Sequence, residues 1–401
     1  MASEPALDLT DQVPNNPPRR ARMTLLRRLI DVVALPSSRI PPQDRSMAGD
    51  VLLEMLFDAD DRERAFCARR LIPTHEAPRR ILRYLGLCRI EISKDLLEQN
   101  ESFDDSDLTY ILRKGTPLHA EAISKRKTLA PAVCDALIEV GHPTAVVNML
   151  TSRRSFISET GMDDLLEASR DHLEYCPLLV QRSEMKPHHA MTMFWWSESE
   201  EREQILMRYS ADRSELIEIC GDVFAMAAAE NWADPVARKT LQLIERRQRN
   251  RAAIERSRYE SLEDAIEHAE KSGMDRELAQ EIGYLGGIKP ITAAKILTDP
   301  GGEALAVFCK ATGLKRHYLS RLWAALRRPT EIGPGNLHPH YERIRDVYEM
   351  LSVAKAQSTL RYWNWSLSSS FRNRNAEDHI DDETDREFSS SHRTARLVFG
   401  D

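Results

Sequence analysis

The apolar positions between residues 92 and 197 repeat at a nearly constant spacing. Four apolar anchors lie 26, 28 and 28 residues apart, and each is followed by two further apolar residues within nine positions. A period of this length is typical of helical repeat proteins, in which each unit buries its apolar face against its neighbours. The pattern therefore predicts stacked pairs of short helices. The four sets are Phe103, Leu108 and Leu112; Leu129, Val133 and Leu137; Ile157, Met162 and Leu166; and Met185, Ala190 and Phe194.

Helix start and stop signals fall at matching places in these repeats. Acidic and hydroxyl side chains accept hydrogen bonds from free backbone N–H groups at a helix start, and proline has no N–H to leave free. We expect Gly115 and Gly141 to end two of the helices as left-handed caps. Helices this short are marginal alone, so stacking must stabilise them. The expected starts are after Asp104, at Pro131, after Ser158 and at Pro187.

Helical patterns continue on both sides of the repeats. A stripe of apolar residues over 25–33 predicts a helix that stops before Pro36 and caps the array. Two longer helices are expected to begin near 214 and 236, the second of them rich in arginine over 246–258. A single final helix is expected to run from 341 through 353.

Together these patterns predict an all-α fold. We expect a right-handed α-solenoid of short HEAT-like helix pairs, followed by a C-terminal helical subdomain. The predicted parts are a disordered N-terminal arm over 1–23, the repeat array over 24–250, the helical subdomain over 251–360 and a disordered acidic tail over 366–401.

Parts of the chain resemble a known family. The phrases ISKRKTLAPAVCDALIEVGH (123–142) and VVNMLTSRRSFIS (146–158) are the most specific. They resemble an uncharacterised, mainly alphaproteobacterial domain-of-unknown-function family built from HEAT-like helical repeats, and the resemblance covers roughly residues 45 to 330. It implies a helical repeat fold and a bacterial cytoplasmic context. The family carries no catalytic residues over to this chain.

Composition narrows the functional classes. The chain of 401 residues is 42% hydrophobic and 30% charged, which suits a soluble repeat array. A net charge of -7 argues against a globally cationic nucleic-acid binder. The six cysteines are spread singly, so we expect them to be small buried residues in a reducing compartment rather than metal ligands. No apolar run approaches the roughly 20 residues that span a bilayer, so no membrane is expected as a partner.

A helix-turn-helix-like hairpin at 305–326 is the main candidate for nucleic-acid binding. Apolar residues flank a turn at Gly313, and the second helix is expected to present polar and basic side chains outward, with no carboxylate among them. Such a helix could enter a major groove. Any helical hairpin with a glycine turn has the same pattern, however. The candidate contacts are Lys315, Arg316, His317, Ser320 and Arg321.

Two further groups of residues invite a functional interpretation. His188 and His189 follow Pro187 at a helix start, where we expect surface residues and no metal, because adjacent helical positions diverge by about 100 degrees. Trp195 and Trp196 are candidate partner anchors, because one of them is expected to face outward or into the next unit.

No catalytic, cofactor or metal-binding motif is recognisable in the sequence. We therefore expect a non-enzymatic scaffold or adaptor of the bacterial cytoplasm, which binds protein partners along the concave face of its repeat array. The alternative is a DNA-binding regulator that uses the hairpin at 305–326.

Overall fold

The computed structural model describes residues 17–36, 38–210, 257–333 and 335–369. The helices expected from 214 and 236 and most of the acidic tail lie outside these residues. The described elements are helices apart from one two-stranded hairpin, so the prediction of an all-α fold is confirmed. The chain forms two compact units, Met1–Asp164 (unit 1) and Leu165–Asp401 (unit 2).

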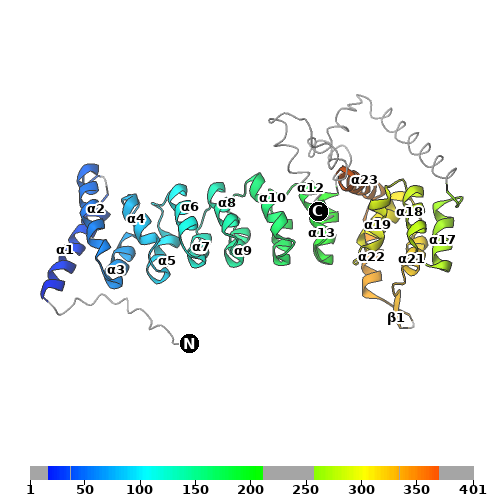
Figure 1. Ribbon diagram of the computed structural model, residues 1–401, viewed down its shortest axis with the longest axis horizontal. Helices are drawn as coiled ribbons and strands as arrows, with labels where there is room; N and C mark the ends of the chain where they lie inside the picture. Colours follow the sequence, from blue (N-terminus) through cyan, green and yellow to red (C-terminus); the bar gives the residue numbers. More distant parts are fainter. Residues whose placement is uncertain (1–16, 37, 211–256, 334, 370–401) are drawn as a thin grey trace, which may run out of the picture. The chain divides into compact units, whose positions relative to one another are not determined.

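Unit 1 consists of short helices that pack in two rows. α3 packs on α5, α5 on α7 and α7 on α9, while α2 packs on α4, α4 on α6 and α6 on α8 (Figure 1). Each of these helices thus contacts the helix two places before it in the chain, as expected for stacked helix pairs. The right-handed α-solenoid of HEAT-like helix pairs stays a prediction. The helices are α1 (Pro17–Ala34), α2 (Pro42–Phe57), α3 (Asp61–Leu71), α4 (Arg79–Gly86), α5 (Ile90–Gln99), α6 (Asp105–Lys114), α7 (Pro117–Ser124), α8 (Pro131–Val140), α9 (Pro143–Thr151) and α10 (Glu159–Ala168), whose last residues belong to unit 2.

All twelve repeat positions predicted to be apolar anchors are buried, with at most 7% of any of these residues exposed. The helices begin where the capping signals place them, at Asp105, Pro131, Glu159 and Pro187. The N-cap Asp104 accepts a hydrogen bond from the backbone N–H of Asp107, and the Asp107 side chain accepts one from the N–H of Asp104. Local capping chemistry therefore positions the repeat helices.

The two glycine caps differ from each other. Gly141 adopts the predicted left-handed conformation with φ 66°. The prediction was wrong for Gly115, whose φ is −81°. Gly115 is instead favoured because there is no room for a side chain. A Cβ there would lie 2.8 Å from the carbonyl oxygen of Ile111 and 3.0 Å from the ring of His119.

Three side-chain hydrogen bonds to backbone carbonyls link helices of unit 1 to helices about one repeat earlier in the chain. The Tyr84 hydroxyl donates to the carbonyl of Leu56, 28 residues earlier. Asn100 Nδ2 donates to the carbonyl of Leu71, and Arg126 Nη1 donates to the carbonyl of Leu97, each across 29 residues. These separations match the spacing of the apolar anchors, so the polar contacts follow the same period as the core.

Unit 2 continues with short helices and then gathers longer ones around α20. This helix packs against α22 and α23, and nearly all of its residues are buried. The elements are η1 (Leu173–Tyr175), α11 (Cys176–Val180), α12 (Pro187–Met193), α13 (Ser199–Tyr209), α17 (Leu262–Ser272), α18 (Arg276–Leu285), α19 (Pro290–Thr298), α20 (Glu303–Thr312), α21 (Arg316–Ala325), β1 (Glu331–Gly333), β2 (Asn336–Leu337), α22 (Pro339–Met350) and α23 (Val353–Ser369).

The expected single final helix is instead two helices, α22 and α23. Leu351 is extended with ψ 131°, which ends α22. The hydroxyl of Ser352 then accepts a hydrogen bond from the backbone N–H of Lys355, which caps the new helix. The break was missed because apolar residues continue through it at helical spacing, and Ser352 alone was a weak signal.

Candidate functional site

The predicted hairpin at 305–326 exists, but carboxylates from other elements lie beside its second helix. α20 and α21 are joined at Gly313, which is left-handed with φ 80°. Arg321 pairs with Glu267 and Glu270 of α17. The prediction counted only carboxylates within the hairpin, whereas these partners are about 50 residues away in the chain.

The other candidate nucleic-acid contacts lie in mixed surroundings. Arg316 Nη1 is 3.3 Å from Glu349 Oε1, an exposed pair that water screens. The Ser320 hydroxyl lies 2.5 Å from the Tyr341 hydroxyl. Lys315 and His317 are exposed. The structure thus brings the five residues together on α21 and its N-cap, and DNA binding stays a prediction.

The two candidate partner anchors, Trp195 and Trp196, are both half-buried. The ring centroid of Trp195 lies 4.9 Å from that of Trp363 in α23, and the Lys295 ammonium is 5.6 Å from its centroid. Trp196 Nε1 donates a hydrogen bond to Ser169 Oγ at 3.1 Å. Both indoles therefore have partners inside unit 2, which limits the surface that either can offer.

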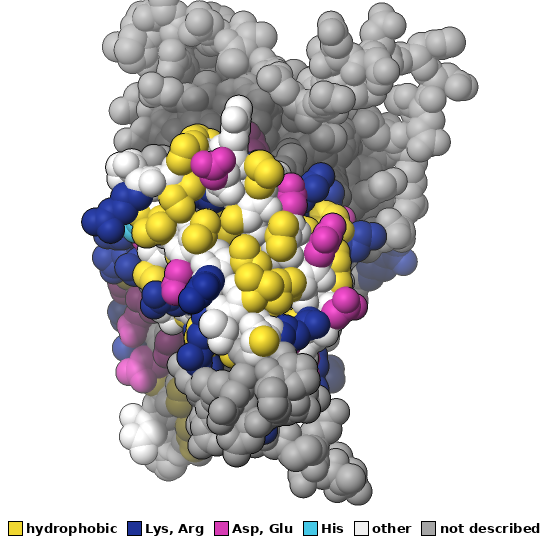
Figure 2. Space-filling model, turned by 90° about the vertical axis from the view of Figure 1, so that its left-hand side faces the viewer, with side chains coloured by type: hydrophobic (Ala, Val, Ile, Leu, Met, Phe, Trp, Pro, Cys, Tyr) yellow, Lys and Arg dark blue, Asp and Glu magenta, His cyan; other side chains and the backbone are white. Residues whose placement is uncertain are grey.

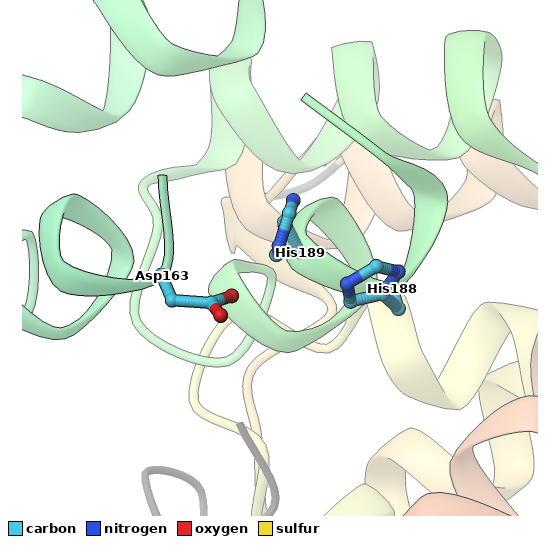
Figure 3. Close-up of side chains that lie close together, drawn as sticks. All are labelled: Asp163, His188 and His189. Atoms are coloured by element: carbon cyan, nitrogen blue, oxygen red, sulfur yellow. The ribbon is translucent and has the colours of Figure 1, made fainter. Parts of the chain in front are cut away.

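His188 and His189 were predicted to be surface residues, and this was wrong: they are 2% and 1% exposed. Their ring centroids lie 4.0 Å apart. Figure 3 shows both side chains on α12. His189 Nδ1 accepts from the backbone N–H of Lys186, and the hydroxyl of Tyr362 in α23 donates to the carbonyl of His188. Every residue of α12 is buried, so adjacent positions are covered despite diverging directions.

Imidazoles are common metal ligands, but a zinc site takes three or four protein ligands. The expected absence of a metal stays a prediction.

The cysteines of the described residues offer little reactivity. Cys67, Cys134, Cys176 and Cys309 are buried and lie outside any disulfide, as predicted, whereas the prediction was wrong for Cys88, which is half-buried. Burial raises the pKa of the Cys67 and Cys309 thiols, with the Glu63 carboxylate adding to the shift at Cys67. These thiols are protonated at neutral pH and therefore poor nucleophiles.

A buried charge cluster in unit 2 was missed by the sequence reasoning. Arg202 of α13 lies 2.7 Å from Asp299 Oδ1 and 3.0 Å from Glu303 Oε2, and all three are at least nine-tenths buried. Asp299 Oδ2 also accepts from the backbone N–H groups of Gly302 and Ala304 at the start of α20. The cluster fixes α13 to α20, so we assign it a structural role.

Three exposed cations gather on two neighbouring loops of unit 1, and we call Lys127, Arg153 and Arg154 the basic loop pair. Lys127 lies between α7 and α8, and the two arginines lie between α9 and α10. The side chains of all three are exposed. Within the described residues, none of the three forms a side-chain ion pair or hydrogen bond.

The backbone holds these two loops side by side. Leu129 N–H donates to the carbonyl of Arg154, and Phe156 N–H donates to the carbonyl of Leu129, both at 3.1 Å. Leu129 and Ser155 thereby form a parallel bridge, which places Lys127 and Arg153 at equivalent positions two residues earlier. These backbone hydrogen bonds therefore fix the loop positions from which the three cationic side chains extend.

The surroundings of the basic loop pair distinguish it from ordinary surface charge. Lys125 Nζ is 2.7 Å from Glu121 Oε1, and Arg126 donates to the carbonyls of Leu97 and Asn100. These two neighbouring cations are thus already engaged. Phe156 is 55% exposed beside the arginines. The site therefore combines positive charge on fixed loops with an exposed aromatic ring. Its residues lie in the two sequence segments, 123–142 and 146–158, on which the family resemblance rests.

No helix among the described residues is both long and apolar enough to cross a membrane.

A comparison with known protein families gives a match. No curated protein and no solved structure matches the chain. A family model described as "Uncharacterised protein conserved in bacteria (DUF2336)" matches residues 92–361, which include the basic loop pair and the hairpin at 305–326. The match begins later and ends further along than the expected 45 to 330. Because it covers more than half of the chain, the protein belongs to the DUF2336 family of uncharacterised bacterial proteins.

Proposed function

We propose that the protein is a non-enzymatic scaffold or adaptor, and that its basic loop pair binds an acidic segment of a protein partner. One observation carries this proposal: Lys127, Arg153 and Arg154 lie exposed on loops joined by backbone hydrogen bonds, with no carboxylate paired to them in the described residues. Use of the concave face of a repeat array remains part of the proposal.

Charge and an exposed aromatic ring both favour a protein segment as the ligand. The chain as a whole carries a net charge of -7, so a local cationic site concentrates attraction for an anionic partner at one place. Phe156 adds an exposed aromatic ring, and aromatic side chains are enriched at protein interfaces. Because the loops are pre-ordered, binding loses less conformational entropy at the site.

The test is a comparison of retained proteins between the wild type and a charge-reversed variant. Immobilised wild-type protein and K127E/R153E/R154E are incubated with bacterial lysate at low and at moderate salt, with and without nuclease. We expect the wild type to retain a protein, and this retention should survive nuclease treatment and weaken with salt. The variant should retain at least about tenfold less of the same protein. The variant should keep the wild-type circular dichroism, because its three changes are exposed.

A matched control is K94E/R113E/K114E, which makes the same charge change on exposed residues of α5 and α6. It should retain the partner as the wild type does. Equal loss in both variants would show that only net charge matters, and retention by K127E/R153E/R154E would refute the assignment. If nuclease abolished retention, the ligand would be a nucleic acid, and the DNA-binding alternative would replace the proposal.

A further inference from the structure

The first two helices of unit 1 expose apolar side chains on the side away from the repeats. On α1, Leu25, Leu29 and Val32 recur at helical spacing and are exposed or half-buried. On α2, Met47 and Val51 are 69% and 49% exposed. Figure 2 looks onto this side and shows hydrophobic side chains in its middle, with cationic and anionic side chains around them. We call these five residues the α1–α2 face.

Both helices are also apolar on their inner side. Leu26, Ile30 and Val33 of α1 and Leu52 and Leu56 of α2 are fully buried. α1 packs on α2 and α3, and α2 packs on α4. An inner repeat is covered by a neighbour on each side, and a terminal repeat needs a polar outer face to stay soluble. The α1–α2 face lacks that polar surface, so it resembles the face of an inner repeat that another repeat would cover.

The exposed charges around the α1–α2 face differ in sign between the two helices. Arg28 of α1 is exposed and lies three residues after Leu25. Asp44 and Glu54 of α2 are exposed, three residues before Met47 and three after Val51. None of these three charged side chains forms an ion pair within the described residues. The rim is thus basic along α1 and acidic along α2.

We propose that the α1–α2 face binds the same face of a second copy of this chain, with α1 of each copy lying on α2 of the other. A two-fold axis parallel to the helices produces this arrangement, and each contact then occurs twice. Arg28 of one copy meets the acidic rim of the partner copy, and the apolar stripes of the two copies bury each other. The alternative two-fold arrangement would place α1 on α1 and bring like charges together.

The experiment measures the mass of the full chain in solution by sedimentation over a range of concentrations. Wild type is expected at twice the mass of one chain, and L25E/V51E at the mass of a single chain with unchanged circular dichroism. As a control, L118E/V140E carries two equivalent changes at other exposed apolar residues and should remain a dimer. A wild-type monomer at about 100 µM, or a dimer that persists in L25E/V51E, would overturn the proposal.

A charge-swap series tests the pairing of the helices. R28E should weaken the dimer at least about tenfold, because it places like charges opposite each other, and R28E/D44R/E54R should restore it. If R28E left the dimer unchanged while L25E/V51E abolished it, the copies would meet with α1 on α1, and the proposed pairing would be wrong.

Discussion

Single capping residues determine where the repeat helices begin, and Asp104 is the best-defined example. Partial burial tends to raise the pKa of its carboxyl, but hydrogen bonds from the Asp107 backbone N–H and the Ser106 hydroxyl, together with the Arg79 guanidinium, outweigh it. The pKa is therefore lowered from its ordinary value of 3.8. A lowered pKa means that the ionised carboxylate stabilises the folded state above that value and that this stability is lost as the pH falls through the folded-state pKa.

We expect Asp104→Ala to lower the free energy of unfolding by about 1 kcal/mol at pH 7, because the cap is lost. Asp104→Asn should lower the free energy of unfolding by only about a few tenths of a kcal/mol, since asparagine also caps helices but cannot titrate. Urea unfolding of the three proteins between pH 7 and pH 3 measures both effects. The wild-type advantage over Asp104→Asn should shrink toward pH 3; an advantage that is constant with pH would contradict the assigned role.

A second residue-scale prediction concerns the buried Arg202. Arg202→Leu leaves the carboxylates of Asp299 and Glu303 buried without their cation, so we expect a loss of about 3 to 5 kcal/mol in unfolding free energy. The control is Arg258→Leu, which removes an exposed partner of Glu277 and should cost no more than about 1 kcal/mol. Chemical denaturation compares them, and equal small losses would show that the cluster contributes little.

These two residues also show what a sequence can reveal at this scale. Asp104 acts on backbone groups three residues away, so its role was visible in the sequence. Arg202 pairs with residues 97 and 101 positions later, and nothing local to α13 marks that contact. For the same reason the partners of Arg321 were missed and the basic loop pair was not recognised, because its site depends on two loops meeting at Leu129.

At the scale of helices, the apolar period was sufficient to predict the core of the repeats. The anchors are buried because each helix has one apolar side and a neighbour on that side. The period failed where tertiary contacts surround a helix, as for His188 and His189 on α12. It also failed where a helix breaks without losing its apolar spacing, as at Leu351. The period of apolar residues reveals a helix that is buried on one side, but it does not reveal a helix that is buried on several sides.

Replacement of one anchor should affect more than its own helix. Leu137 of α8 is fully buried, and Leu137→Ala is expected to cost about 2 to 5 kcal/mol through lost contacts and a residual cavity. Because α8 packs on α6, amide hydrogen exchange should also speed up in α6. Leu118→Ala, at a residue 50% exposed, is the control and should change neither stability nor exchange by a comparable amount. Faster exchange confined to α8 would contradict stacking as the source of stability.

At the scale of the whole molecule, the chain has two compact units, Met1–Asp164 and Leu165–Asp401. We expect calorimetric unfolding to show two transitions, because each unit has its own buried core. Leu137→Ala should lower the transition of unit 1, and Arg202→Leu that of unit 2. A single transition that both variants lower together would show that the units unfold as one.

The direction of the hydrogen bonds between repeats has a consequence for biosynthesis. Tyr84, Asn100 and Arg126 all reach back to carbonyls 28 or 29 residues earlier. As the chain leaves the ribosome from its N-terminus, every such acceptor emerges before its donor, and each new helix meets a docking surface already in place. Arg202 must instead wait for Asp299 and Glu303, which are synthesised about a hundred residues later. We therefore expect these contacts of unit 1 to form helix by helix during synthesis, and the core of unit 2 to close only after its C-terminal helices are made.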